Sequence, residues 1–493
     1  MLAAKIGFDS EKYTELQSVR IRERISQFGK LYLEFGGKLF DDYHASRVLP
    51  GFAPDNKVRM LEQLRDQVEV VIAVGAAAIE ENKIRDDIGI NYAAETLRIK
   101  EKMEERGFYV GSIVITQYTG QPAADRFRQR LEEQGIATYI HHVIEGYPNN
   151  IPLILSEDGY GKNDYIQTTR NLVVLTAPGP GNGKMATCLS QLYHEHKRGV
   201  SAGYAKFETF PVWNLSLKHP INVAYEAATA DLEDVNMIDP FHLDAYGETT
   251  VNYNRDVEVF PVLSAIFEGI MGESPYKSPT DMGVNMIGFC ISDDDVCREA
   301  ANQEIIRRYF KTACDVKLGI APKEELYKLE LLLKQSGLAP EDRAVVPAAL
   351  ARQEETGTPA MAMELPDGTM VTGRTTDPLG AASAALMNAL KHYAGLADEL
   401  KLVSPATITP IQELKTRYLG STNPRLHTDE TLIALSGSAS QNPLAMMALQ
   451  QLPRLKGAEA HSTVMLSSVD TSVFRRLGIN LTCSPVAKKE LRL

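Results

Sequence analysis

The pattern of apolar and polar positions along the chain predicts strands that alternate with helices. Short apolar runs rich in β-branched residues are typical of strands buried in a parallel sheet; they occupy 30–35, 68–74, 109–115, 137–143 and 172–175. Stretches with the 3.6-residue period of amphipathic helices lie between or beside them, at 18–28, 57–67, 92–106, 123–134 and 185–193. This order predicts an α/β protein built from doubly wound parallel sheets of the Rossmann or P-loop kind.

The composition and the pattern of predicted elements change twice along the sequence, which divides the 493 residues into three predicted domains. Residues 1–150 form an N-terminal α/β domain, and residues 151–320 form a P-loop-like α/β domain after a turn-rich link. We expect each of these two blocks to be a doubly wound unit. Residues 321–493 combine charged and alanine-rich helices with a predicted hairpin around Pro366-Asp367-Gly368, which favours an α+β domain.

Composition narrows the possible partners and the cellular location. The net charge of −12 disfavours a general nucleic-acid role, and no run of 18 apolar residues suggests a membrane span. Because the first residues also lack the apolar core of a signal peptide, we expect a cytoplasmic protein. The five cysteines are odd in number and contain no CxxC pair, so we expect reduced thiols and no metal site.

A glycine-rich turn between a strand and a helix is the strongest candidate for a binding site. Residues 177–184 read Ala-Pro-Gly-Pro-Gly-Asn-Gly-Lys, an order that suits a phosphate cradle at a helix N-terminus. The predicted phosphate-binding residues are Gly179, Gly181, Asn182, Gly183, Lys184 and Thr187. The match to a P-loop is incomplete, because Pro178 replaces its first glycine and Met185 replaces the hydroxyl that binds magnesium. The alternative is a plain glycine-rich turn with a solvated lysine.

A second anion site is predicted from other basic and small residues. Gly37 and Lys38 follow the first strand, and His44 and Arg47 lie in a polar stretch that we expect to be an irregular loop. Arg374 and Thr375 precede a helix expected to start near Pro378 and face a cleft shared between domains. In the alternative interpretation, these are solvated loops and helix caps, and Ser436 to Ser440 is another small-residue loop.

Three residues are candidates for catalysis. Asp239 is the best-placed acid downstream of the glycine-rich turn to position a metal ion or water. Lys206 and Glu208 are two apart on a predicted strand, so both side chains point to one face near the same crevice. The alternative for Asp239 is an acidic loop that caps a helix. His194 and His196 are two apart on a helix, a spacing that cannot hold one zinc ion.

The chain resembles a bacterial domain-of-unknown-function family, number 1846, over essentially its full length. The segments that carry the resemblance are 33–52, 177–187, 236–242 and 372–382. The family has no established function to carry over, although some members are labelled ATP-dependent peptidases.

The leading functional hypothesis is an enzyme that acts on a phosphorylated or nucleotide-like small molecule. The cofactor is open, with a nucleotide and magnesium as one candidate, and we expect an anionic substrate and a homo-oligomer. A rival is a non-catalytic sensor or assembly protein of the same fold, which Met185 favours. A third possibility, an ATP-dependent peptidase, lacks a metal-binding spacing or a nucleophile motif.

Overall fold

The computed structural model describes residues 5–37, 39–85 and 88–487, and the chain forms two compact units. The larger unit contains residues 6–226 and 232–301, and the smaller unit contains residues 302–487 with a short segment at 227–231. The predicted α/β class, with a parallel sheet and a separate C-terminal mixed-sheet unit, is confirmed.

The larger unit is built on a seven-stranded parallel sheet in the order β11-β8-β1-β7-β2-β5-β6. Its strands are β1 (Leu31–Phe35), β2 (Val68–Gly75), β5 (Tyr109–Tyr118), β6 (Thr138–His142), β7 (Leu172–Thr176), β8 (Gly203–Phe207) and β11 (Gly283–Val284). The central strands are buried along their whole length, as their apolar, β-branched runs predict.

Strands from the first two predicted blocks form one sheet, which corrects the expectation of two doubly wound units. Leu172 of β7 pairs with Leu31 of β1 on one side and with Val68 of β2 on the other. The strand of the second block thus fills the place between two strands of the first. Pairing between segments some 140 residues apart leaves no local mark in the sequence, and this is why the expectation failed.

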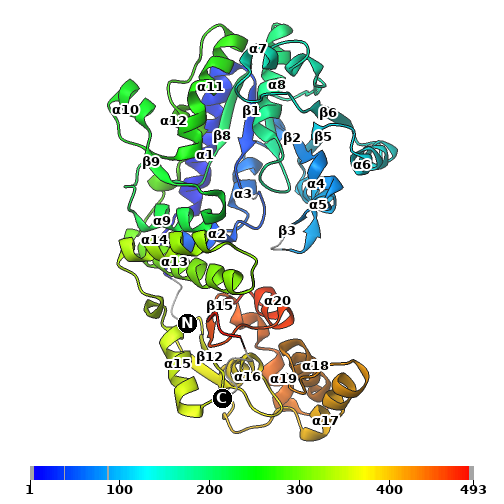
Figure 1. The fold of residues 1–493 in the computed structure, drawn as a ribbon, viewed down its shortest axis with the longest axis vertical. Coiled ribbons are helices and arrows are strands. Elements are labelled where there is room, and N and C mark those ends of the chain that lie inside the picture. Colours follow the sequence, from blue (N-terminus) through cyan, green and yellow to red (C-terminus); the bar gives the residue numbers. More distant parts are fainter. Residues whose placement is uncertain (1–4, 38, 86–87, 488–493) are drawn as a thin grey trace. The chain divides into compact units, whose positions relative to one another are not determined.

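Helices cover both faces of the sheet (Figure 1), and α1 (Ser10–Phe28) and α8 (Lys184–Lys197) pack against the central strands. The other helices of this unit are α2 (Tyr43–Val48), α3 (Asn56–Glu62), α4 (Ala76–Glu80), α5 (Tyr92–Glu105), α6 (Pro122–Glu133), α7 (Ile151–Ile154), α9 (Pro220–Ala228), α10 (Pro240–Tyr246), α11 (Asn254–Met271) and α12 (Pro279–Met282). Two small antiparallel pairs complete it: β3 (Ile84–Arg85) with β4 (Ile90–Asn91), and β9 (Asn236–Ile238) with β10 (Val251–Tyr253).

The order of the strands creates a topological switch point between β1 and β7. From β1 the chain passes β7 to reach β2, and from β7 it passes β1 in the opposite direction to reach β8. The connection after β1 and the connection after β7 both begin at the carboxyl edge of the sheet and run in opposite directions, so their first residues diverge. In open α/β sheets, ligands bind in the crevice that such a divergence opens at the carboxyl ends of the strands. Both Gly-Lys turns of the sequence begin here.

The smaller unit has a four-stranded mixed sheet in the order β13-β12-β14-β15. Its strands are β12 (Ala360–Glu364), β13 (Met370–Arg374), β14 (Glu459–Ser462) and β15 (Asn480–Cys483). After α13 (Asp294–Lys317), the helices are α14 (Lys323–Ser336), α15 (Val345–Thr356), α16 (Ala381–Tyr393), α17 (Pro405–Glu413), a π-helical turn η6 (Leu414–Tyr418), α18 (Thr428–Ala439), α19 (Pro443–Leu449) and α20 (Ser468–Arg476). An apolar core lies between this sheet and α16, α18 and α19.

Several local expectations were wrong. The stretch that holds His44 and Arg47 is helix α2, because the Asp42 side chain accepts the Ala45 N–H and caps it. The small residues at 436–439 lie inside α18. In both cases small or polar residues were interpreted as a loop, because the helix cap and the buried helix face were not recognised in the sequence.

Candidate functional site

The glycine-rich turn joins the carboxyl end of β7 to the first residue of α8, so the predicted strand–turn–helix order is present. Gly181 and Gly183 have φ angles of 75° and 69°, in the left-handed region that favours glycine. Gly183 is the residue at the N-terminal cap of α8, and Lys184 starts the helix. Among the described residues, the backbone N–H groups of residues 181–185 have no hydrogen-bond acceptor. A row of such groups at a helix N-terminus is what an anion requires.

The Asn182 side chain holds this turn in shape. Its Oδ1 atom accepts a hydrogen bond from the Gly75 N–H at 2.7 Å, and its Nδ2 atom donates to the Gly179 carbonyl at 2.8 Å. The Thr116 hydroxyl donates to the Asn182 carbonyl at 3.0 Å. The turn is therefore connected to the ends of β2 and β5. The Asn182 side chain is buried, and its amide is used in these hydrogen bonds.

Two threonines near the turn differ in what they offer a ligand. The Thr187 hydroxyl is buried and donates to the Gly183 carbonyl at 3.0 Å, so it braces the first turn of α8. Thr176 ends β7 directly before the turn, and its buried Oγ1 atom has no hydrogen-bond partner among the described residues. Buried hydroxyls nearly always form a hydrogen bond, so the Thr176 hydroxyl is a candidate contact for a ligand.

The turn after β1 lies beside the turn after β7, because the two strands are neighbours in the sheet. Gly37 has a φ of 66°, and Lys38 lies outside the described residues. The buried Lys57 ammonium donates to the Gly36 carbonyl at 3.1 Å and lies 2.9 Å from the Asp42 carboxylate. Burial raises the pKa of Asp42, but the Lys57 charge and hydrogen bonds outweigh this and hold the pKa below its usual range.

A basic network that the sequence did not reveal supports the same turn. Asp41 has an unusual φ of 62° and its carboxylate lies 3.0 Å from the Arg98 guanidinium on α5. Arg98 and the buried Arg85 both pair with Glu95, which is fully buried. These three helix and strand residues lock the strained residue in place. No local motif links them, because they meet only when α5 packs beside the turn.

Lys206 and Glu208 meet at the carboxyl end of β8, with Nζ and Oε1 2.8 Å apart. Lys206 also bonds the Asp256 carboxylate and the Tyr253 hydroxyl, and both partners come from the segment that begins α11. Burial and the charge of Asp256 raise the pKa of Glu208 to about 7, against the lowering effect of Lys206. The structure thus places a carboxyl group that titrates near neutral pH beside a lysine and a second carboxylate, a pattern common at reactive sites.

An aromatic cluster connects this charged group to α2. The His44 ring lies 5.2 Å from that of Phe210, which stacks on Tyr225 at 5.5 Å. Tyr225 in turn lies 6.4 Å from Tyr253, and the Lys206 ammonium lies 4.7 Å above the Tyr253 ring. A chain of ring contacts thus links the predicted site residue His44 to Tyr253, which contacts both Lys206 and Glu208. Arg47 shares α2 with His44.

The other predicted residues lie elsewhere. The buried Asp239 carboxylate caps α10 through the Phe241 and His242 N–H groups, and it also accepts two hydrogen bonds from Thr280. Arg374 is exposed at the end of β13, and the Thr375 N–H donates to the Pro359 carbonyl at 2.8 Å. Helix α16 starts at Ala381, three residues later than expected. Their catalytic and anion-binding roles, and the cleft shared between domains, stay predictions.

No group of three His, Cys, Asp or Glu side chains in the described part of the chain is arranged to hold a metal ion. His194 instead bonds the Asn163 carbonyl at 2.8 Å through Nε2, and burial lowers its pKa. None of the helices that the structure describes is long and apolar enough to cross a membrane.

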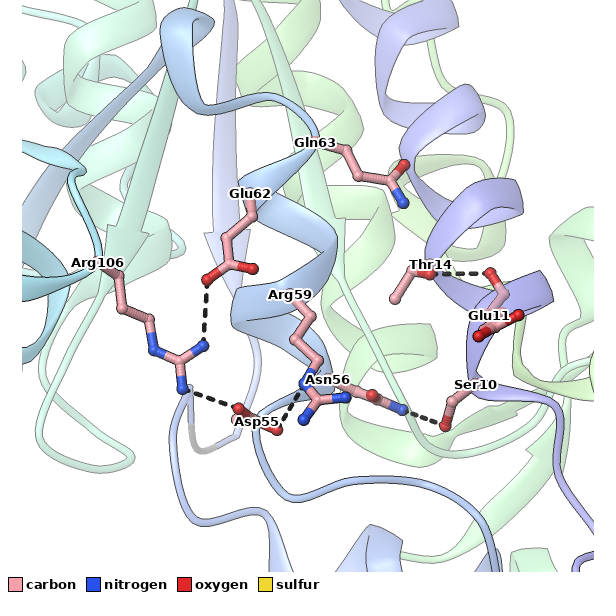
Figure 2. A pocket seen from close by; sticks show the side chains of 9 residues that line it. All are labelled: Ser10, Glu11, Thr14, Asp55, Asn56, Arg59, Glu62, Gln63 and Arg106. Carbon is pink, nitrogen blue, oxygen red and sulfur yellow. Dashed lines mark hydrogen bonds and ion pairs between the residues drawn. The ribbon is translucent and has the colours of Figure 1, made fainter.

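A hollow of about 550 Å³ lies apart from these residues, between α1 and α3 (Figure 2). Four of its charged side chains pair with one another: Arg106 lies 2.8 Å from Asp55 and 3.1 Å from Glu62, and Arg59 lies 3.1 Å from Asp55. It contains none of the predicted site residues, and both of its arginines are already paired with carboxylates. We therefore place the candidate site at the switch point.

The larger unit is thus an α/β protein with a candidate anion site at the switch point of a parallel sheet. Residues 6–337 match the model of the domain of unknown function DUF1846, N-terminal, and residues 341–491 match the C-terminal model. The chain belongs to the DUF1846 family. It is 58% identical to the UPF0371 protein str1377 of Streptococcus thermophilus and to a UPF0371 protein of Streptococcus pneumoniae, in each case over 98% of both chains. The resemblance seen in the sequence is confirmed.

Proposed function

We propose that the larger unit binds the phosphate group of a small molecule at residues 179–184 and carries out a reaction on it. The observation that carries the proposal is the row of N–H groups at residues 181–185 without an acceptor among the described residues. They lie at the start of a 14-residue helix and at the topological switch point. The buried Thr176 hydroxyl, unpartnered among those residues, supports a ligand at the same edge.

Charge favours an anion at this place although the chain as a whole is acidic. Lys184 adds a full positive charge at the positive end of the α8 dipole. The backbone contributes further donors without adding to the count of charged residues. Selective binding of an anion by a protein of net charge −12 then depends on these local groups.

The chemistry proposed for the site is proton transfer by Glu208. A general acid or base works best when its pKa lies near the working pH, and the pKa of Glu208 is about 7. Lys206 and Asp256 hold the carboxyl group and tune it. In this proposal the phosphate anchors the substrate and Glu208 exchanges a proton with the part that reacts.

The turn itself offers no ligand for magnesium. Met185 lacks a hydroxyl, and the Thr187 hydroxyl donates to the Gly183 carbonyl. The proposal therefore favours a phosphorylated small molecule held by N–H groups and Lys184 over a nucleotide held through magnesium. The same observation supports the rival, a sensor that binds the anion without turnover. Five free cysteines among the described residues suit the reducing cytoplasm, where we propose the protein acts.

Calorimetric titration with inorganic phosphate, pyrophosphate and sugar phosphates tests the binding. Lys184→Ala should weaken binding by about 1.5–3 kcal/mol, the value of one charge-assisted contact. Lys162→Ala removes an exposed lysine of the same unit and should change nothing. Equal affinity in both variants, or no binding of any of these anions by the native chain, would contradict the proposal. An enzyme should convert the bound compound, and Glu208→Gln should abolish this conversion while binding is retained. A sensor should bind the compound without converting it, even as the native chain.

A further inference from the structure

We propose that two copies of this chain associate through α17 and η6 of the smaller unit, packed antiparallel about a two-fold axis. This inference does not depend on the proposed function, because it concerns other residues. It gives a place in the structure to the homo-oligomer expected from the sequence.

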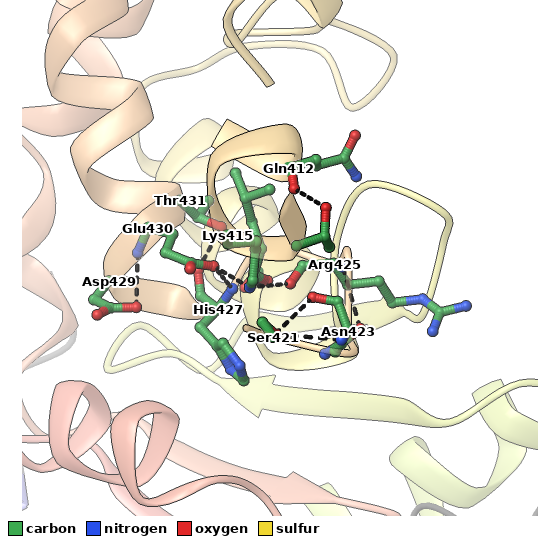
Figure 3. Close-up of polar contacts among 12 residues, drawn as sticks. Gln412, Lys415, Ser421, Asn423, Arg425, His427, Asp429, Glu430 and Thr431 are labelled. Carbon is green, nitrogen blue, oxygen red and sulfur yellow. Dashed lines mark hydrogen bonds and ion pairs between the residues drawn. The ribbon is translucent and has the colours of Figure 1, made fainter. Parts of the chain in front are cut away.

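Helix α17 and the turn η6 form an unusual segment of the smaller unit. None of the nine residues of α17 is buried, and Lys415 is the one buried residue of η6. The Lys415 ammonium points inward, donating to the Arg425 carbonyl at 2.8 Å and to Glu430 at 2.6 Å, and so anchors the turn to the start of α18 (Figure 3). A helical segment held by one buried lysine gains little from its own packing.

The outer side of this segment carries an apolar row. Ala406, Pro410, Leu414 and Tyr418 are exposed and follow one another at four-residue intervals, which places them on one side of a helix. The side chains of Leu414 and Tyr418 are 51% and 73% exposed, and the adjacent Leu419 is 71% exposed. The inner side also carries apolar residues, Ile408 and Ile411, which are half-buried. A helix that is apolar on both sides is normally covered on both.

The charges beside the row indicate that the cover is a second copy. Glu413 and Arg417 are both exposed, lie four residues apart on one flank of the row, and form no ion pair within the described chain. In an antiparallel pair of identical helices, a two-fold axis brings the same flank of both helices together. With the axis at the level of Lys415, Glu413 of each copy lies opposite Arg417 of the partner subunit. Leu414 then lies beside its own counterpart, and Tyr418 lies between the levels of Pro410 and Leu414 of the partner subunit, so the two apolar rows interdigitate.

This arrangement is self-complementary in charge. Each interface contains the pair Glu413–Arg417 twice and one continuous apolar seam. Opposite charges that border an apolar contact set its register and suppress other pairings. An unrelated partner would need an independent match to the same spacing, whereas a second copy supplies it automatically.

Analytical ultracentrifugation of the full chain tests the proposal. The native chain should sediment as a concentration-dependent dimer, and Leu414→Asp or Tyr418→Asp should raise the dissociation constant at least about tenfold. Leu331→Asp and Tyr327→Asp are matched controls, because these residues on α14 are 53% and 59% exposed. Unchanged circular dichroism would show that the variants fold, as expected for exposed side chains.

Charge reversal distinguishes this geometry from any other use of the same surface. Glu413→Arg alone and Arg417→Glu alone should each weaken the dimer, since each places two pairs of like charges in contact. An equimolar mixture of these two variants should form a heterodimer, and the double variant should regain the native dissociation constant. A monomeric native chain, a dimer insensitive to Leu414→Asp, or a failure of the mixture to associate would overturn the proposal.

Discussion

The Asn182 side chain accepts the Gly75 N–H at 2.7 Å, and this bond fastens the turn after β7 to the end of β2. The same amide donates to the Gly179 and Pro180 carbonyls at 2.8 and 3.2 Å. One buried side chain thus fixes three backbone groups. The backbone N–H groups of the turn are thereby set out before any ligand arrives, which lowers the cost of ordering them on binding.

Asn182→Ala should destabilise the larger unit by about 2–3 kcal/mol, because the buried Gly75 N–H loses its acceptor. Unfolding in urea followed by the fluorescence of Trp213, the single tryptophan, reports on this unit. Asn149→Ala, at an exposed position, should stay within about 0.5 kcal/mol of the native chain. Equal stability of the two variants would show that the amide contributes nothing to the turn.

The raised pKa of Glu208 should make the larger unit less stable as the pH rises. The carboxyl group ionises near 4.5 when unfolded and at about 7 when folded, so the folded state holds the extra proton between these values. Raising the pH through this window should lower the free energy of unfolding, by at most about 1.4 kcal/mol per pH unit. Urea unfolding at pH 5, 6, 7 and 8 measures it.

Glu208→Gln should remove this slope, because the amide does not titrate and leaves the Lys206–Asp256 pair in place. Glu145→Gln is the matched control at an exposed site and should keep it. If the native chain and the Glu208 variant show the same pH dependence, the carboxyl group does not titrate in this window and cannot be the proton carrier proposed above.

His427 should stabilise the starts of α18 and α20 at low pH. Its Nδ1 atom lies 3.1 Å from Asp470, which also accepts the Thr428 N–H at 2.9 Å. The hydrogen bond with Asp470 raises the pKa of His427, against the lowering effect of burial. The contribution is therefore complete below pH 6.5 and lost as the pH rises through the folded value.

Hydrogen exchange, corrected for its intrinsic pH dependence, localises the effect of His427. Residues 428–439 should open more easily at pH 8.5 than at pH 5.5, by about 0.5–1 kcal/mol for a partly exposed pair. His427→Gln should abolish the difference, while α15 should show none in either protein. A difference that persists in the variant would assign it to another group.

The sequence predicted those features that neighbouring residues determine. The strands at 68–75 and 172–176 were recognised because every residue in them is buried and nearly all of these residues are apolar. Helix α16 was predicted, although its start was placed three residues too early, since alanines fill its buried side. The strand–turn–helix order around Gly183 was also predicted, because consecutive residues determine it.

Features that depend on distant residues were missed. Asp256 and Tyr253 contact Lys206 only after α11 packs near β8, and no spacing of residues in the sequence predicts this contact. The order of strands in the sheet was likewise hidden, so two sheets were expected where one exists. The capping role of Asp239 was weighed as an alternative from the sequence, and its hydrogen bonds to Phe241, His242 and Thr280 agree with that alternative.

The position of β7 between β1 and β2 constrains how the protein is made. During synthesis, β1, β2, β5 and β6 leave the ribosome before residues 172–176 exist, so the centre of the sheet lacks a strand at that stage. The facing edges of β1 and β2 then carry unpaired backbone groups and apolar side chains, which are prone to wrong pairing. Fragments that end near residue 150 should therefore aggregate, and the nascent chain has reason to depend on a chaperone until β7 arrives.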